Sequence, residues 1–288
     1  MRRGFLIGGG LILLGLMLQL GVGPVMWDTL AWPVNGIVMA AFLLLIAVCY
    51  LLRKKVSLCR FVGTYQAAIP ALVYAVVLTI VMGLIRQNPE GRWLDNMLVF
   101  WPFVLIYVYM ALILGQVVIR QFVTAFSHSR FHLPNFSLLS HLGLFLAMTT
   151  ATLGNADMQR LKMVTTIGER EWRAVTPYGT IQEMPMTIEL KQFIMETYDD
   201  GSPKRFASEI LVRTNDNEEI QTTIDVNKPV EVDGWKIYQY SYDTQMGPQS
   251  QISILELVSA PWLPLVYTGI YMLLAGAVCM FIFGGKKK

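Results

Sequence analysis

Six long apolar segments constrain this chain more than any other feature. Each holds most of the roughly 20 apolar residues that a helix needs to cross a bilayer. Lipid offers backbone groups no hydrogen-bond partners, so such segments cross as helices. The sequence therefore predicts an integral membrane α-helical protein with six transmembrane helices. They are Phe5–Val25, Val34–Leu52, Ile69–Ile85, Met97–Ile119, Ser137–Leu153 and Trp262–Phe283.

The first segment follows Met1-Arg2-Arg3, which would also suit the basic start of a signal peptide. Its apolar stretch is long, however, and no clear A-x-A cleavage site follows it. We therefore expect a retained helix, with a cleaved signal as the alternative.

Charge divides the chain into two kinds of sequence. Charged residues make up 15% of the chain, against about 25% in a typical soluble domain. All but three of the 20 acidic residues lie between Asp157 and Glu256. We predict a membrane domain with five helices over residues 1–154, a polar domain over 155–259, and a final helix with a basic tail over 260–288.

The polar domain shows strand-like alternation in five segments, separated by turn residues such as Asp233-Gly234, a good hairpin candidate. This pattern predicts one antiparallel β domain, either a sandwich or a partial barrel. The segments are residues 184–190, 207–213, 220–226, 235–242 and 250–257. Acidic residues outnumber basic ones here, which argues against nucleic acid as a partner.

Lys and Arg predict the orientation of the helices. One set of loops and ends carries most of the basic residues, and the opposite short loops carry only Arg86 and Arg92. Both termini are therefore expected in the cytoplasm. The β domain then lies outside it, in the periplasm if the membrane is a bacterial inner membrane. The basic set is Arg2, Arg3, Arg53, Lys54, Lys55, Arg60, Arg120, Arg130 and Lys286–Lys288.

Several function classes lack the residues they need. The expected spans contain no Asp or Glu, which argues against a proton-coupled or ion-coupled transporter. No P-loop, G-x-S-x-G, H-E-x-x-H or C-x-x-C-H motif occurs. Cys49, Cys59 and Cys279 form no C-x-x-C pair, so thiol–disulfide exchange has no candidate residues. A self-contained enzyme active site is therefore not predicted.

His141 is the main candidate functional residue, because it lies inside the fifth apolar segment. An imidazole in lipid is costly without a partner. A metal or haem ligand and a helix–helix hydrogen bond are about equally compatible with its position. His128 and His132 lie in the loop before this segment, where contact with membrane lipid headgroups is the simpler interpretation and a contact with haem the alternative.

With His141-Leu142-Gly143 in its first span and a strand–turn–strand motif between Ile224 and Tyr242, the second half of the chain resembles the ResB/CcsB family of cytochrome c biogenesis proteins. The resemblance covers about 150 residues at the C-terminal end, and its most specific part is a strand–turn–strand motif. A weaker element is His141-Leu142-Gly143 in a span that leads directly into the outer domain. The motif residues are Ile224, Val226, Asn227, Pro229, Gly234, Ile237, Tyr238, Gln239, Ser241 and Tyr242.

The resemblance implies a subunit of a system II cytochrome c synthetase complex that helps to move haem across the membrane and present it with apocytochrome c. It implies a CcsA/ResC-like membrane haem protein as partner, haem b as a transient and shared cofactor, and His141 as an axial ligand of the haem iron. Any holocytochrome c synthase (haem lyase) activity would belong to the complex. The alternative is a scaffolding membrane protein whose β domain binds a protein partner without a cofactor.

Overall fold

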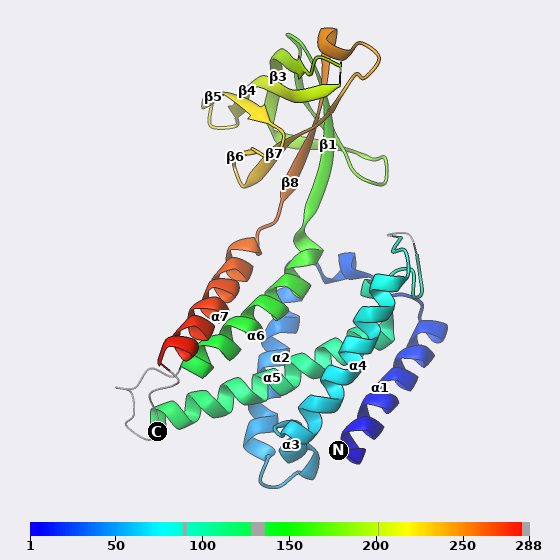
Figure 1. Cartoon of the computed structure of the whole chain (residues 1–288), viewed down its shortest axis with the longest axis vertical. Helices are drawn as coiled ribbons and strands as arrows, with labels where there is room; N and C mark the ends of the chain where they lie inside the picture. The colour runs from blue at the N-terminus through cyan, green and yellow to red at the C-terminus, as the bar shows by residue number, and fades with distance from the viewer. Residues whose placement is uncertain (89–90, 128–135, 201, 284–288) are drawn as a thin grey trace. The chain divides into compact units, whose positions relative to one another are not determined.

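The computed structural model describes residues 1–88, 91–127, 136–200 and 202–283, and the chain forms two compact units (Figure 1). The first unit is helical and comprises Met1–Ala156 with Trp262–Lys288, and the second is the β domain Asp157–Pro261.

Six helices of the first unit are long and apolar enough to cross a membrane, as the sequence predicts. A shorter helix, α3 (Ser57–Val62), was not predicted because six residues are too few to show a period. The six long helices are α1 (Arg2–Gly21), α2 (Val34–Leu52), α4 (Tyr65–Leu84), α5 (Trp101–Ser127), α6 (Phe136–Gly154) and α7 (Leu263–Phe283).

The helix boundaries differ from the expected ones where polar residues or proline continue a helix. Helix α4 begins before Ile69 and contains Pro70 near its start. Helix α5 runs past Ile119 through the polar residues Arg120 and Gln121 to Ser127. Hydropathy detects only the apolar part of a helix, so the predicted boundaries stopped where the polar residues begin.

Helices α6 and α7 pack side by side, with glycine at their closest approach (Figure 1). A Cβ atom on Gly143 would collide with backbone atoms of Gly269 and Leu273, and one on Gly276 with Ser140. Small residues permit this backbone-to-backbone approach between membrane helices. The α6–α7 seam, meaning Ser140, Gly143, Gly269 and Gly276, is therefore sterically closed.

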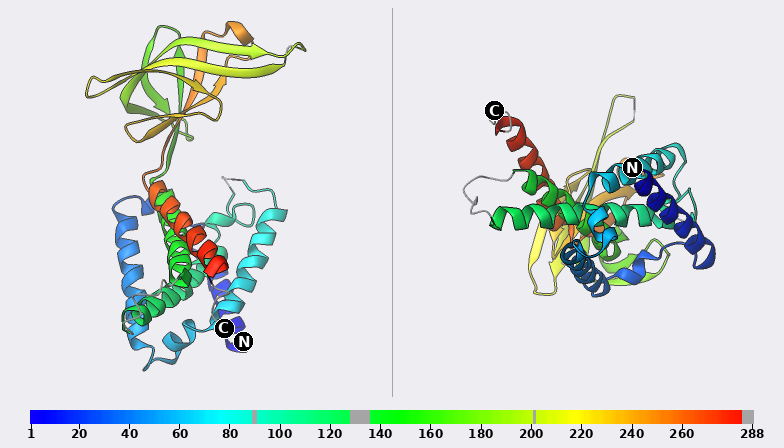
Figure 2. Two further views of the ribbon diagram at one scale, coloured as in Figure 1. Left: turned by 60° about the vertical axis from the view of Figure 1, so that its left-hand side comes forward. Right: turned by 90° about the horizontal axis from the view of Figure 1, so that it is seen from below.

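The β domain is a single antiparallel sheet with the strand order β5-β4-β3-β2-β1-β8-β7-β6, which confirms the predicted fold class. The long β3–β4 hairpin extends beyond the other strands (Figure 2). The strands are β1 (Gln159–Thr166), β2 (Arg170–Val175), β3 (Ile181–Thr197), β4 (Pro203–Thr214), β5 (Glu219–Asp225), β6 (Val230–Val232), β7 (Trp235–Tyr242) and β8 (Ile252–Ser259).

This sheet curls around one core, as a partial barrel does. Strands β5 and β6 stand at opposite ends of the strand order, yet only residues 226–229 join them, and Asp225 bridges to Lys228. The buried side chains of all eight strands form one cluster, which includes Met163, Met184 and Met186. These three methionines therefore serve as core packing.

The predicted hairpin at Asp233-Gly234 is present and joins β6 to β7. Both of its turn residues have positive φ (48° and 76°), the conformation that a two-residue hairpin turn requires.

Strands β1, β2 and β6 were not predicted. Strand β2 buries only Ala174, so it has almost no apolar alternation, and β6 has three residues.

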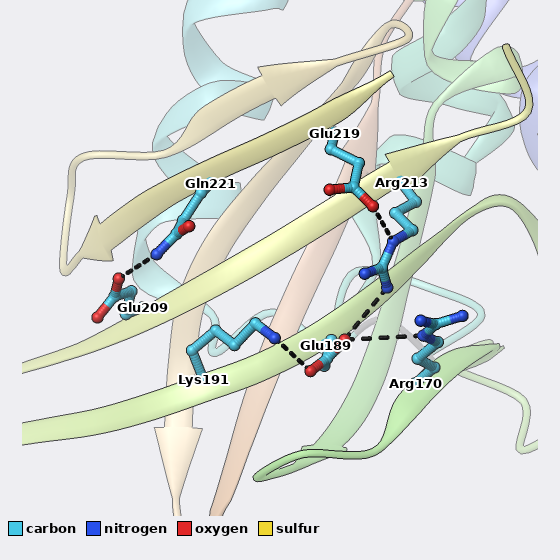
Figure 3. Close-up of polar contacts among 7 residues, drawn as sticks. All are labelled: Arg170, Glu189, Lys191, Glu209, Arg213, Glu219 and Gln221. Carbon is cyan, nitrogen blue, oxygen red and sulfur yellow. Dashed lines mark hydrogen bonds and ion pairs between the residues drawn. The ribbon is translucent and has the colours of Figure 1, made fainter. Parts of the chain in front are cut away.

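Ion pairs cover the outer face of β2 to β5 (Figure 3). Glu189 on β3 accepts from Lys191 Nζ at 2.5 Å and from Arg213 at 3.1 Å, and Arg170 lies 3.7 Å away. Arg213 also donates to Glu219 on β5 at 2.6 Å. These contacts, the Lys191 hydrogen bond first, hold the pKa of Glu189 below its usual value. The outer face is thus a charged, solvated surface.

Candidate functional site

His141 lies five residues after the first residue of α6, on the side that meets α5. Its Nδ1 is 2.6 Å from the backbone carbonyl oxygen of Ser137, one helical turn earlier, and 3.2 Å from the Ser137 hydroxyl. Gln121 of α5 places its amide nitrogen 3.5 Å from the same Nδ1. All three contacts converge on one of the two ring nitrogens.

This geometry selects a tautomer of the neutral imidazole. A carbonyl oxygen can only accept, so Nδ1 must carry the proton that it donates to Ser137. The lone pair then resides on Nε2. Within the described residues no hydrogen-bond partner meets Nε2. A histidine ligand of a metal usually has this arrangement, with its other ring N–H held by a carbonyl.

Gln121 is a neighbour of the site that the sequence did not suggest. Its Nε2 donates to the Ser137 hydroxyl at 3.1 Å. Its Oε1 is buried and has no hydrogen-bond partner in the part of the chain that the structure describes. Ser137 could have been inferred from its spacing of four residues before His141, but Gln121 could not, because its role depends on how α5 and α6 pair.

The opposite side of α6 is fixed by the seam with α7. Ser140, the residue before His141, donates to the carbonyl oxygen of Leu273 at 3.3 Å. Gly143 of the His141-Leu142-Gly143 element lies against the backbone of Gly269. The glycine of this element therefore has a packing role, and it fixes the helix that carries the histidine.

Other polar side chains at membrane depth are bonded to backbone carbonyls of neighbouring helices. Gln116 of α5 donates to Ile46 of α2 at 2.7 Å, and Tyr107 of α5 donates to Met148 of α6 at 3.1 Å. Asn35 of α2 donates to Leu153 at 3.2 Å. These three bonds identify Gln116, Tyr107 and Asn35 as links between helices, whereas His141 keeps a ring nitrogen without a partner among the described residues.

An apolar groove of about 240 Å³ lies between α2, α5 and α6. Its lining includes Gly115, Phe122, Leu142 and Phe145, and it does not include His141. His141 and this groove are therefore separate features of the described part of the helical unit.

No group of three or more His, Cys, Asp or Glu side chains comes together among the residues described, so a metal site built from this chain alone has no support there. The donor chemistry of His141 fits haem iron, since imidazole is a common axial ligand. His128 and His132 fall outside the described residues.

Two tryptophans at the loops connect neighbouring segments. Trp27 Nε1 donates to the carbonyl of Leu98 at 3.0 Å, and Trp101 Nε1 donates to that of Gly23 at 2.9 Å. Both indoles therefore hold the loops at this end of the helices together.

The motif residues of the β domain have structural roles. Gln239 is buried and shares hydrogen bonds with Ser253, which Ser208 joins from β4 at 2.7 Å. Asn227 takes a positive φ of 65° in the turn before β6. Tyr242 stacks on Phe193 with ring centroids 5.0 Å apart. The motif thus specifies how the sheet turns and packs.

Comparison with known proteins finds relatives of the part of the chain that contains α6 and most of the β domain. Residues 136–250 match the ResB-like family. This part of the chain is thus similar to ResB-like proteins. A curated relative, the cytochrome c biogenesis protein CcsB of Prochlorococcus marinus subsp. pastoris, is 30% identical over 104 residues, which is 35% of this chain and 23% of the relative. The match thus spans less than a quarter of that relative's length. The family match starts at residue 136, the first residue of the helix that carries His141.

Among solved structures, the cytochrome c haem lyase CcmF aligns with 85% of this chain and 45% of its own chain, at 14% identity and a TM-score of 0.34. A likeness this distant adds nothing to the account of the fold or the site.

Proposed function

We propose that this protein is a cytochrome c biogenesis subunit that holds haem b through His141 as an axial ligand. The observation that carries the proposal is the contact of 2.6 Å between His141 Nδ1 and the Ser137 carbonyl. It leaves the Nε2 lone pair available on a helix that belongs to the ResB-like part of the chain. The relative's role in cytochrome c biogenesis supports the same assignment.

The second axial ligand would come from a partner, a CcsA/ResC-like membrane haem protein. Among the described residues no group of three or more His, Cys, Asp or Glu side chains comes together, and His141 does not line the apolar groove, so a ligand from a partner is the simpler arrangement. Bound haem supplies the vinyl carbons that become thioether-linked to cytochrome cysteines. This chain would contribute one iron ligand, while its β domain would hold apocytochrome c.

The proposal includes an orientation. The chain would reside in a bacterial inner membrane with both termini in the cytoplasm and the β domain in the periplasm, as the distribution of Lys and Arg favours. His141 would then lie near the cytoplasmic end of α6. Labelling of single cysteines at residues 198 and 288 by a reagent that cannot cross the membrane tests this: residue 198, an exposed position of the β domain, should react in intact spheroplasts, and residue 288 only after lysis.

The ligand role is tested by His141→Gly in the chain co-expressed with its CcsA/ResC-like partner. We expect the Soret absorbance of the purified complex to fall strongly, and added imidazole to restore it by occupying the space of the missing ring. Such rescue separates ligation from a structural role, because free imidazole cannot replace a helix–helix contact. The haem content is measured as the pyridine haemochrome.

Ser140→Ala is the matched control, since Ser140 precedes His141 but faces α7. It should keep its haem. Unchanged haem content in the His141→Gly complex would eliminate the ligand role and leave the scaffolding alternative.

A further inference from the structure

The hairpin between β2 and β3 ends in an apolar, uncharged tip. Val175, Tyr178 and Ile181 are 39%, 83% and 69% exposed. No charged residue occurs from 174 to 182, in a domain that carries 17 acidic and 10 basic residues over 157–261. An exposed apolar group of this kind on a charged domain indicates an interaction surface.

The tip is an ordered turn. Thr176 and Thr180 bond through both backbone (2.9 Å) and hydroxyl groups (2.7 Å), and Gly179 takes a φ of 80°. Val175 and Ile181 are paired across the two strands directly before the turn. The three apolar side chains are therefore presented by a rigid support, so their exposure is a property of the fold.

The tip lies near the two points where the chain enters and leaves the β domain. Gln182 donates to Gln159, the first residue of β1, at 3.3 Å, and Gln159 pairs with Ser259, the last residue of β8. The tip is thus at the end of the sheet where the chain enters and leaves the domain. Helix α6 ends at Gly154, five residues before Gln159, a distance of at most about 17 Å for extended chain.

We propose that this tip, Val175, Tyr178 and Ile181, inserts into the headgroup–acyl boundary of the membrane that α6 and α7 cross. The connection from α6 to β1 is short enough for this end of the domain to reach the bilayer surface. Tyrosine with aliphatic neighbours and no charge suits that depth, where an aromatic ring sits among headgroups. The inference depends on the helices spanning a membrane and is independent of haem.

The β3–β4 hairpin provides a matched control within the same domain. Tyr198 is also exposed, at 56%, but it is followed by Asp199 and Asp200. It follows Thr197, at the opposite end of β3 from Ile181. The two exposed tyrosines thus lie near opposite ends of one strand. They differ in the charge of the residues beside them and in their distance from the point where the chain enters the domain.

The test places a nitroxide label at each position in the full chain, in vesicles of phosphatidylcholine and phosphatidylglycerol. The variants are Tyr178→Cys and Tyr198→Cys in a background with Cys49→Ala, Cys59→Ser and Cys279→Ala. We expect collisions with oxygen relative to a water-soluble nickel complex to be severalfold more frequent at 178 than at 198. Adding Val175→Asp and Ile181→Asp should lower the ratio at 178 to that at 198.

Equal ratios at the two positions would overturn the proposal and leave a protein partner as the occupant, because these vesicles contain only lipid and this chain. If the cysteine-free background does not fold, a fluorinated phenylalanine at 178 or 198 in the natural chain gives the same measurement. Its ¹⁹F relaxation by a spin-labelled lipid should be faster at 178. Equal relaxation at the two positions would also overturn the proposal.

Discussion

The helical unit and the β domain satisfy their polar groups in different ways. In the helices, uncharged side chains such as Gln116 and Tyr107 donate to backbone carbonyls of neighbouring helices. In the β domain, charged pairs such as Glu189 with Arg213 lie on the outer face, and a neutral cluster around Gln239 lies inside. The difference teaches where each unit is vulnerable: helix packing in the first, and buried polar groups and pH in the second.

The same contrast separates His141 from the side chains that link helices. Gln116 and Tyr107 donate to other helices, whereas His141, like Thr149 and Thr150, bonds within its own helix, and it also leaves Nε2 available. A side chain that only linked helices would direct its donor to another helix. The four predictions below concern the surrounding framework, from the largest expected effect to the smallest.

The largest effect is expected from Gly143→Leu in the α6–α7 seam. The added side chain would meet backbone atoms of Gly269 and Leu273, which cannot rotate away. Overpacking commonly costs about 1–3 kcal/mol, and a clash with backbone should reach the upper end or beyond. Hydrogen–deuterium exchange of α7 in nanodiscs should rise sharply.

Gly10→Leu is the control for this substitution. Gly10 lies in α1, and a Cβ there meets nothing within 4 Å. It should leave the exchange of every helix unchanged. If Gly143→Leu behaves in the same way, the seam does not hold α6 and α7 together.

Gln239→Leu should have the next largest effect, in the β domain. Its amide nitrogen donates to Ser253 and to the Ser241 carbonyl, both at 2.9 Å, inside the sheet. Leucine of similar size leaves these buried groups without their partner, at a cost of about 1–3 kcal/mol. Exchange of β7 and β8 amides should increase, while exposed Gln221→Leu on β5 should have little effect. Protection that survives in Gln239→Leu would show that the cluster is dispensable.

Gln116→Leu should produce a smaller change in the helical unit. The hydrogen bond from Gln116 to Ile46 links α5 to α2, but such bonds in membranes average about 0.6 kcal/mol. The carbonyl of Ile46 also keeps its place in the α2 helix. A slight rise in α2 exchange is expected, and none from Thr79→Val, which removes a bond within α4 only. A loss of exchange protection in α2 as large as the loss that Gly143→Leu causes in α7 would contradict this ranking.

Much of the fold follows from periodicity, as particular elements show. Strand β7 matches its predicted range, 235–242, because Trp235, Ile237 and Gln239 alternate with more exposed residues. Strand β1 has the same alternation, with Leu161, Met163 and Thr165 buried, but charged residues interrupt it in the sequence. Strand β2 has one buried residue and could be placed only through its partners.

The candidate site divides in the same way. Sequence places His141 one to two turns into an apolar helix, because that requires only local pattern. The contacts of Nδ1 with Ser137 and Gln121 depend on rotamer and on the pairing of α5 with α6, which hydropathy does not encode. Gly143 is part of the His141-Leu142-Gly143 element. The need for glycine there arises from the close approach of Gly269 on α7, more than 100 residues away in the sequence.

The smallest effect should come from Glu189→Gln, and it should depend on pH. The hydrogen bond from Lys191, followed by that from Arg213, lowers the pKa of Glu189 in the folded protein. The folded pKa is below the unfolded one, so this stabilisation is complete above the unfolded pKa and is lost as pH falls through the folded pKa. The protection of β3 and β4 amides, corrected for the pH dependence of the intrinsic exchange rate, should therefore fall with acid in the natural chain and less steeply in Glu189→Gln. Glu183→Gln, exposed on the same strand, is the control. Identical acid profiles for all three chains would show that the Glu189 ion pairs contribute nothing to the acid sensitivity of the β domain. The difference between the two units would then be reduced to the buried polar cluster around Gln239.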